Sequence, residues 1–413
     1  MAEHDTQSPP ASGHASPAEA TQPRAPFLHA MEGVRTIYLV TLAAACAPLA
    51  AGVILFGWRS LLVAAISVAS CVLIEKAYYR STRTPALLGR SHAAMTGVLL
   101  ALTLPAFVPW YVPIIAAVFA IVVGKAIFGG VGHFLWQPAL LGRLAVAVLL
   151  PATMNPTSWP LLAQNRLMVG DITRAQQVDD YRQWRGRPAP AGADAFLLTR
   201  PSETLAALTA GETAEYRALA YPDDDSGAGG QLLMRLPPIN EMLYGATPGG
   251  IGETCAIVIV IAGLYLIYRN YVKWQLPLAF ILTAWAVAAV APIQLTGPAD
   301  SIRTVWWPLL AEGGDVGFTY VNYQLLSGEL LLAAFFMAPE MTSRPVTSGG
   351  QVIFGIGCGI IAMLLKLYVH VPIPSYMAVL AMNTLTPAID AIWRPRVLGQ
   401  RRISYLKSRL RWR

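Results

Sequence analysis

The sequence predicts an all-α membrane protein that crosses the bilayer about ten times. Of its 413 residues, 55% are apolar and only 13% are charged. The mean hydropathy is positive, at +0.49. Apolar runs long enough to span a bilayer recur along the whole chain, and such runs are not typical of soluble domains. We therefore expect a polytopic membrane protein.

The apolar runs form two groups of five, separated by a polar stretch. The expected spans are 36–56, 61–79, 93–109, 111–128 and 138–154, then 250–268, 276–296, 318–338, 351–370 and 376–393. An odd number of spans per repeat inverts the second copy relative to the first. Thr96-Gly97-Val98-Leu99-Leu100 in the third span is similar to Ser327-Gly328-Glu329-Leu330-Leu331 in the eighth. This similarity favours two inverted five-helix repeats.

The composition also predicts how the chain is divided. The predicted segments are a disordered cytoplasmic tail (1–30), a first membrane half (31–154), an outer loop insertion (155–249), a second membrane half (250–393) and a basic cytoplasmic tail (394–413). With a cytoplasmic N-terminus, eighteen Lys and Arg residues fall inside, whereas the short outer loops hold only Arg59 and Arg303. Both termini are therefore expected in the cytoplasm, and the insertion outside.

The charge and the cysteines exclude several classes of function. The net charge of +7 comes largely from the basic tail, which directly follows an apolar run and so favours anionic lipid over nucleic acid. Cys46, Cys71, Cys255 and Cys358 lie in apolar runs and form no C-x-x-C pair, so they suggest neither a disulfide framework nor an iron–sulfur site.

Histidines and catalytic motifs give no site either. His92, His133 and His370 stand isolated in the sequence, and the other three histidines lie in the N-terminal tail, so no metal site is expected. No nucleophile triad, P-loop or dinucleotide fingerprint is present, so no catalytic residue is assigned.

Ionisable residues inside the spans are the first candidate sites, because burying a charge in hydrocarbon is costly. They are Glu75, Lys76, Glu253, Glu329, Lys366 and Asp390. Glu75, Lys76 and Asp390 lie near cytoplasmic ends, where they can snorkel or pair. Glu329 lies in the middle of an apolar run and needs a partner or a proton. It is the candidate for an ion path.

The segment Tyr244-Gly245-Ala246-Thr247-Pro248 joins the polar insertion to the sixth span. Its threonine hydroxyl lies where an outer loop meets a membrane helix, so Thr247 could carry a cofactor. The plainer interpretation is a turn in which Thr247 caps the helix and Pro248 occupies its first turn. Glu253 follows six residues later and either stabilises the helix start through the helix dipole or contacts the cofactor.

Several segments together resemble the RnfD family, a membrane component of the Rnf complex, and more distantly the related NqrB family of the sodium-pumping NADH:quinone reductase. In the first half they are 95–105, 124–132 and 137–143. In the second half they are 245–248, 252–254, 264–268, 345–348 and 354–357, with Asn383, Pro387, Ile389 and Asp390. The resemblance covers nearly everything except the N-terminal tail and the insertion.

The resemblance implies a flavoprotein in a bacterial inner membrane. In that family the threonine of the Gly-Ala-Thr motif carries FMN through a phosphoester bond made by a separate flavin transferase. The matching residues here are Gly245, Ala246 and Thr247, with Glu253 close by. The resemblance further implies other Rnf-type subunits as partners, one of them bearing a second flavin. It implies electron transfer between ferredoxin and NAD coupled to Na+ or H+ transport. Some members also hold a noncovalent riboflavin.

Two departures from the family pattern affect the attachment site. The transferase usually recognises Asp six residues before the threonine and Ser or Thr three before it, whereas this chain has Glu241 and Tyr244. The alternative function is a solute or ion channel or transporter of the same ten-helix architecture without a redox cofactor. In that case Gly245 to Pro248 form only a helix-entry turn, and the isolated protein would carry solute.

Overall fold

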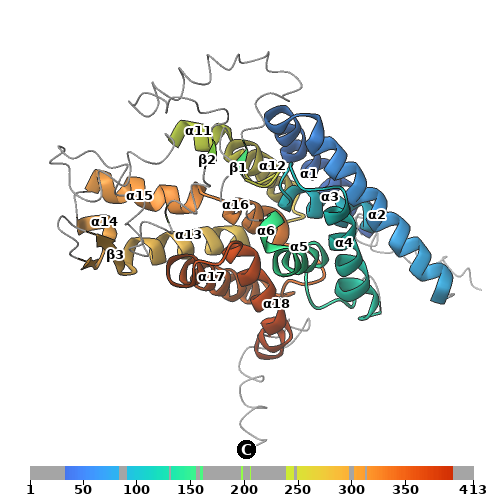
Figure 1. The fold of residues 1–413 in the computed structure, drawn as a ribbon. Helices are drawn as coiled ribbons and strands as arrows, with labels where there is room; N and C mark the ends of the chain where they lie inside the picture. The colour runs from blue at the N-terminus through green and yellow to red at the C-terminus, as the bar shows by residue number, and fades with distance from the viewer. Residues whose placement is uncertain are drawn as a thin grey trace, which may run out of the picture.

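A computed structural model of the chain describes residues 33–82, 91–129, 132–154, 159–160, 197–198, 205, 239–245, 249–296, 302–311 and 314–393. Within these residues the protein is predominantly helical (Figure 1). Two short antiparallel strand pairs accompany the helices, β1 with β2 and β3 with β4. The predicted tails at 1–30 and 394–413 and most of the insertion at 155–249 lie outside the described residues, so the predicted segment boundaries stay predictions.

The first half contains α1 (Val34–Phe56), α2 (Trp58–Thr82), α3 (Ser91–Thr103), α4 (Tyr111–Val118), the π-helical segment η1 (Phe119–Ala126), α5 (Pro138–Leu149) and α6 (Pro151–Met154). Strands β1 (Trp159–Pro160) and β2 (Leu197–Leu198) and helix α11 (Ile239–Tyr244) follow.

The second half contains α12 (Ala256–Tyr268), α13 (Gln275–Val290), β3 (Ile293–Thr296), β4 (Ile302–Val305), α14 (Pro308–Ala311), α15 (Gly314–Leu326), α16 (Leu330–Leu332), the π-helical segment η4 (Ala333–Met337), α17 (Ser348–Leu364), the π-helical segment η5 (Leu365–Val369) and α18 (Pro374–Ile392).

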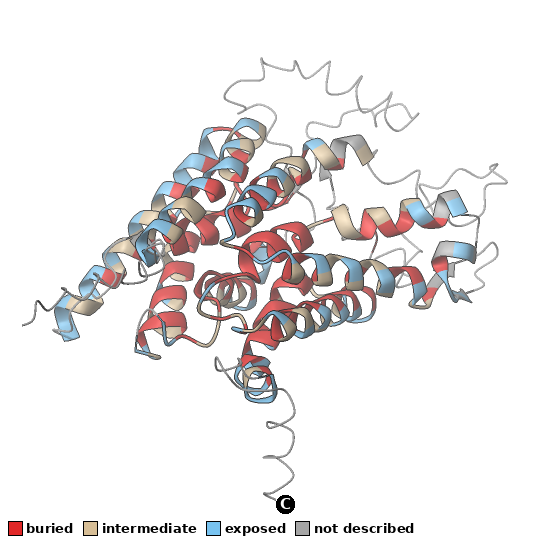
Figure 2. Ribbon diagram, turned by 180° about the vertical axis from the view of Figure 1, so that it is seen from behind, coloured by how far each residue is buried: buried red, intermediate tan, exposed pale blue. Residues whose placement is uncertain are grey.

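Three helices among the described residues are long and apolar enough to cross a membrane: α1, α2 and the continuous helix formed by α17 and η5. Five further apolar helices of 10–17 residues accompany them, among them α12 and α13. Large apolar side chains on the periphery of the molecule face outward, including Leu61, Leu73, Ile261, Leu282 and Ile360. Figure 2 shows this arrangement, with buried residues gathered in the centre and exposed ones along the outer helices. Outward apolar faces on several helices are what lipid requires of a multi-pass membrane protein.

The two halves pack their helices in a similar way. In the first half α2 packs against α3 and α4, and α5 packs against η1. In the second half α13 packs against α15 and α17, and α18 packs against α17. Helix α1 also packs against α12, so the first helices of the two halves meet where the halves join.

Two expected spans are interrupted in the structure. The third helix ends at Thr103 instead of reaching 109, because the Pro105 that follows it lacks a backbone N–H and disfavours helical geometry at the residue before it. The eighth span is broken between α15 and α16, where Gly328 adopts a left-handed φ of 104°. Apolar composition does not reveal the first break, since the residues after Thr103 are largely apolar, whereas the second falls at the short polar segment Ser327-Gly328-Glu329.

Two other expected boundaries are wrong. The sixth helix begins at Ala256 instead of 250, since residues 249–255 form turns. The seventh ends at Val290, and Ile293–Thr296 pairs with Ile302–Val305 in a short hairpin that the apolar pattern did not predict. In β3 the apolar Ile293 and Leu295 alternate with the polar Gln294 and Thr296, which is the pattern of a strand.

Candidate functional site

The loop made of residues 249–253, here the 249–253 loop, is paired with the broken end of the third helix. The backbone N–H of Ile251 donates to the Leu104 carbonyl at 2.9 Å, and that of Gly252 donates to the Leu102 carbonyl at 2.8 Å. Pro105 and Gly250 form an isolated antiparallel bridge. The interruption of α3 therefore leaves carbonyls free to bind the segment that follows the Gly-Ala-Thr motif.

Glu253 fixes the shape of this loop. Its Oε2 accepts a hydrogen bond from the Gly250 N–H at 2.9 Å, and its Oε1 accepts one from the Tyr376 hydroxyl of α18 at 2.7 Å. A Cβ at position 250 would lie 2.7 Å from Glu253 Oε2, so only glycine fits beneath the carboxylate. Glu253 is buried, and hydrogen bonds to a carboxylate are among the stronger ones. Glu253 thus ties the loop to α18, a contact that its place in the sequence did not predict.

On the other side of the motif, Gly245 ends α11 in a left-handed conformation with φ of 87°. A Cβ there would approach Leu55 Cδ1 to 2.7 Å and the Cys255 nitrogen to 2.9 Å. The preceding Tyr244 is 67% exposed. Ala246 and Thr247 lie outside the described residues, so the structure gives the two flanks of the predicted attachment site and not the threonine itself.

Buried polar groups continue from this loop into the centre of the molecule. Arg143 of α5 is fully buried and donates from Nε to the Thr103 carbonyl at 2.9 Å, at the broken end of α3. It also interacts electrostatically with the Tyr376 hydroxyl, as do Glu253 and Glu329. The sequence pattern identified neither Arg143 nor Tyr376, because an arginine at a span boundary suits a cytoplasmic loop and a tyrosine in an apolar run is ordinary.

Glu329 lies at the break in the eighth helix and is 4% exposed. Its Oε1 accepts a hydrogen bond from the Ser375 N–H at 2.9 Å, at the N-terminal end of α18. It interacts electrostatically with Lys366 of η5. The partner that its burial requires is therefore present, and the adjacent residues Ser375 and Tyr376 connect Glu329 to Glu253.

A second buried polar cluster lies apart from the 249–253 loop. The Lys125 ammonium of η1 donates to Glu75 Oε1 at 2.6 Å and lies 3.0 Å from His92 Nδ1. The other ring nitrogen of His92 lies 3.9 Å from Glu340 Oε1, in the segment after η4. His92, which stands isolated in the sequence, therefore has Lys125 and Glu340 as neighbours in the structure, and Lys125 is buried. Among the described residues, no group of three or more His, Cys, Asp or Glu could hold a metal ion.

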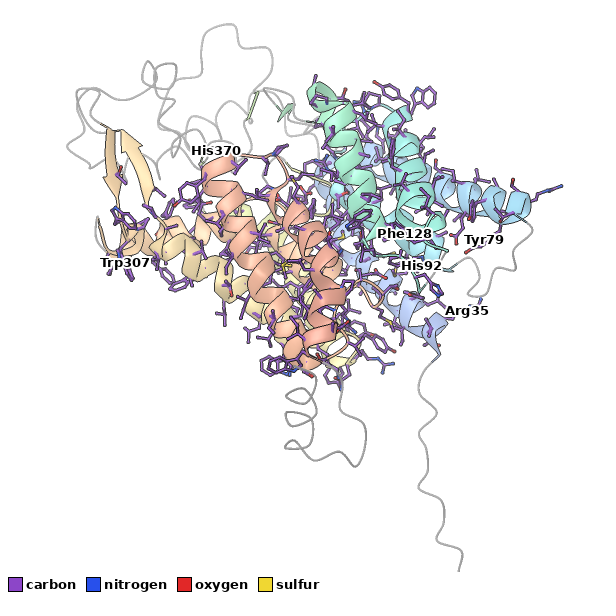
Figure 3. The ribbon with its side chains drawn as sticks, turned by 90° about the horizontal axis from the view of Figure 1, so that it is seen from below. Arg35, Tyr79, His92, Phe128, Trp307 and His370 are labelled. Atoms are coloured by element: carbon purple, nitrogen blue, oxygen red, sulfur yellow. The ribbon has the colours of Figure 1, made fainter. Side chains whose placement is uncertain are left out.

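Figure 3 shows the two halves side by side, seen from below. Arg35, Tyr79, His92 and Phe128 of the first half lie on the right of this view, and Trp307 and His370 of the second half lie on its left.

Comparison with known protein families gives a match along most of the chain. The family described as NQR2, RnfD, RnfE matches residues 21–399. A relative from Halorhodospira halophila, named as part of an ion-translocating oxidoreductase complex, is 31% identical over 92% of this chain and 95% of its own length. A relative from Acetobacterium woodii, named as part of a Na(+)-translocating ferredoxin:NAD(+) oxidoreductase complex, is 29% identical over 92% of this chain and 95% of its own length.

A third relative carries a different ion in its name. This protein of Clostridium ljungdahlii, named as part of a proton-translocating ferredoxin:NAD(+) oxidoreductase complex, is 29% identical over 85% of this chain and 87% of its own length. The resemblance seen in the sequence motifs is thus confirmed along nearly the full chain. The protein belongs to the NQR2, RnfD, RnfE family.

Proposed function

We propose that this protein is the flavin-carrying membrane subunit of an Rnf-type complex that transfers electrons between ferredoxin and NAD and couples the transfer to Na+ or H+ translocation. Relatives named as subunits of such complexes match over most of their own length, which supports the assignment to the whole chain. The chain acts with other subunits, one of which bears the second flavin.

FMN attached to the Thr247 hydroxyl through its phosphate is the proposed cofactor, installed by a flavin transferase. The observation that carries this proposal is the rigid placement of both flanks of the motif. Gly245 is fixed by its left-handed backbone and its close contact with Cys255, and the 249–253 loop is held by α3 and α18. Both flanks of the motif are therefore held in place by contacts within the fold.

The surroundings of this loop also fit a phosphate-linked group. Thr254 is buried, and its hydroxyl has no hydrogen-bond partner among the described residues. Its methyl group lies close to where a Cβ of Gly249 would stand, so the Thr254 side chain borders the backbone that follows the motif. A buried hydroxyl without a partner can donate to a phosphate oxygen. The exposed Tyr244 leaves an approach for a transferase from the aqueous side.

When bound, FMN supplies electron transfer to and from the adjacent subunit. The residues of this chain position it. Glu253 and Tyr376 hold the loop against α18, and Gly250 lets the backbone pass beneath the carboxylate. From the family resemblance we also propose a noncovalent riboflavin, and we assign no residues to its binding site.

The proposed topology is ten spans in two inverted five-helix repeats. Corresponding features of the halves support it: the third helix ends early at Thr103, and the eighth is broken at Gly328. The fourth and ninth helices each end in a π-helical segment with a buried lysine, Lys125 in η1 and Lys366 in η5. Interrupted helices at corresponding positions of two halves are typical of inverted-repeat transporters.

We further propose that the protein resides in the bacterial inner membrane with both termini in the cytoplasm and the Thr247 loop outside. The excess of Lys and Arg in the segments expected inside supports this orientation. Glu329 is the proposed ion-path residue, because it is buried at the helix break and connects through Ser375 and Tyr376 to the carboxylate of the 249–253 loop.

Co-purification and flux distinguish this proposal from a transporter that lacks a cofactor. The tagged chain, produced with its partner subunits, is expected to be recovered in a complex that reduces NAD with ferredoxin as donor. The chain alone, in liposomes, is expected to carry no solute or ion. Flux by the isolated chain together with failure to recover any redox partner would overturn the proposal in favour of a transporter.

A further inference from the structure

The buried lysine of the ninth helix ends in a cage of oxygen atoms at the break of the eighth helix. Lys366 is 8% exposed, and its Nζ donates to the Gln324 carbonyl at 2.6 Å and to the Ser327 carbonyl at 3.1 Å. A third bond runs from Nζ to Ser327 Oγ, at 2.8 Å. All three acceptors are uncharged oxygens within four residues of one another.

These oxygens belong to the C-terminal end of a half-helix. Helix α15 ends at Leu326, and the left-handed Gly328 turns the chain away before α16 begins. The last carbonyls of a helix lack N–H partners in the next turn and form the negative end of the helix dipole. The Glu329 carboxylate, held by the Ser375 N–H, adds a negative charge that interacts with Lys366.

This environment is that of a monovalent cation. Unwound backbone carbonyls and half-helix C-terminal ends coordinate Na+ in transporters built from inverted repeats, and carbonyl oxygens replace the hydration shell of an ion in channels. A lysine ammonium carries the same single positive charge and can donate three hydrogen bonds.

Lys125 provides the internal comparison. It occupies the corresponding π-helical segment of the first half, yet it pairs directly with the Glu75 carboxylate at 2.6 Å. That is the ordinary way to bury a lysine, by an ion pair. Lys366 instead fills a cage of carbonyl and hydroxyl oxygens on a broken helix, with its acidic neighbour already bound to α18.

We propose that the break between α15 and α16 is a monovalent-cation site and that Lys366 fills it as a tethered cation. The ammonium satisfies the Gln324 and Ser327 oxygens and excludes Na+ from them. Removing the ammonium should leave a cage that Na+ occupies. The proposal goes beyond the redox role and does not depend on the flavin at Thr247, because its ligands belong to the eighth and ninth helices.

The test uses the full chain purified in detergent, with its unfolding temperature followed by tryptophan fluorescence. Sodium chloride is titrated against choline chloride at constant ionic strength. The parent is expected to unfold at the same temperature in both salts. Lys366→Met and Lys366→Ala are expected to unfold at lower temperature in choline and to recover in sodium with a saturating dependence, because a ligand that binds only the folded state stabilises it.

Two further variants sharpen the result. Lys273→Met, at an exposed lysine whose Nζ bonds Asn270, is the matched control and should show no sodium dependence. Adding Ser327→Ala to Lys366→Ala removes one cage oxygen and should raise the sodium concentration for half-recovery about tenfold. Alanine at position 366 leaves more room than methionine. If only Lys366→Met fails to recover in sodium, the methionine side chain blocks the cage, whereas failure of both variants shows that the cage does not bind sodium.

Equal unfolding temperatures of the Lys366 variants in sodium and in choline would overturn the proposal and leave Lys366 as a clamp on the end of α15. Failure of both variants to fold even at high sodium chloride would overturn it as well. A wrong flavin assignment at Thr247 would leave the sodium result unchanged, so the two hypotheses fail separately.

Discussion

Tyr376 donates its hydroxyl to the Glu253 carboxylate at 2.7 Å, which joins the start of the last helix to the loop that follows Thr247. The neighbouring Ser375 N–H donates to Glu329 at the break of the eighth helix. One turn of α18 therefore contacts both the 249–253 loop and the proposed ion-path residue Glu329. A shift of α18 would change its contacts with both of them.

Substituting Tyr376→Phe should lower the stability of the protein by about 1–3 kcal/mol, because a buried carboxylate loses one of its hydrogen bonds. The measurement is the unfolding temperature in detergent. Tyr368→Phe is the matched control, since the Tyr368 hydroxyl donates to the Pro292 carbonyl on an exposed face. An equal fall in unfolding temperature in the two variants would mean that the bond to Glu253 stabilises the protein no more than the exposed bond of Tyr368.

Substituting Gly245→Ala should disturb the N-terminal flank of the attachment loop. The left-handed backbone costs a non-glycine residue about 1–2 kcal/mol, and the added methyl group would press on Leu55 and Cys255. We expect reduced covalent flavin on a denaturing gel while the protein still inserts. Gly33→Ala, where nothing lies within 4 Å of the added Cβ, is the control. Undiminished flavin in Gly245→Ala would show that this flank does not need its left-handed turn.

Breaking the Glu75–Lys125 pair on one side should be strongly destabilising, by about 3–5 kcal/mol, because it leaves an uncompensated buried charge. Lys125→Met and Glu75→Leu are the single variants, and their combination should recover much of the loss. Unfolding temperatures of the four proteins form a double-mutant cycle. Strictly additive losses would contradict a direct pairing within the fold.

The variant Glu329→Gln tests the ion path with little change of shape. The glutamine oxygen can still accept the Ser375 N–H, so the contact between Glu329 and α18 is kept while the charge is removed. In the assembled complex we expect electron transfer from ferredoxin to NAD to continue and ion uptake into vesicles to fall. Full ion uptake at an unchanged rate of electron transfer would remove Glu329 from the path.

The membrane class and the approximate positions of most helices follow from apolar run length, and the family follows from the resemblance of several segments, since all of these depend on local sequence. The helix breaks were harder to place. Pro105 explains the early end of α3, whereas the break at Gly328 lies in the short polar segment Ser327-Gly328-Glu329 between apolar stretches, where Lys366 contacts Ser327.

The connections within the candidate site could not be predicted at all. Glu253 was identified from its distance to Thr247, but its partner Tyr376 lies 123 residues away in sequence. His92 looked isolated because Lys125 of η1 and Glu340 of the segment after η4 approach it only in the folded chain. Pairings between distant buried polar residues are set by tertiary packing, which leaves no periodic signal in a single sequence.

The central claim is that Thr247 carries covalent FMN, and in-gel fluorescence of the denatured chain tests it most directly. The chain is co-expressed with a flavin transferase, and Thr247→Ala is run beside it. We predict a fluorescent band in the parent and none in the variant, with equal amounts of protein inserted in the membrane. A dark parent band, with the transferase shown to modify another substrate, would contradict the claim and would identify Tyr244 or Glu241 as incompatible with attachment.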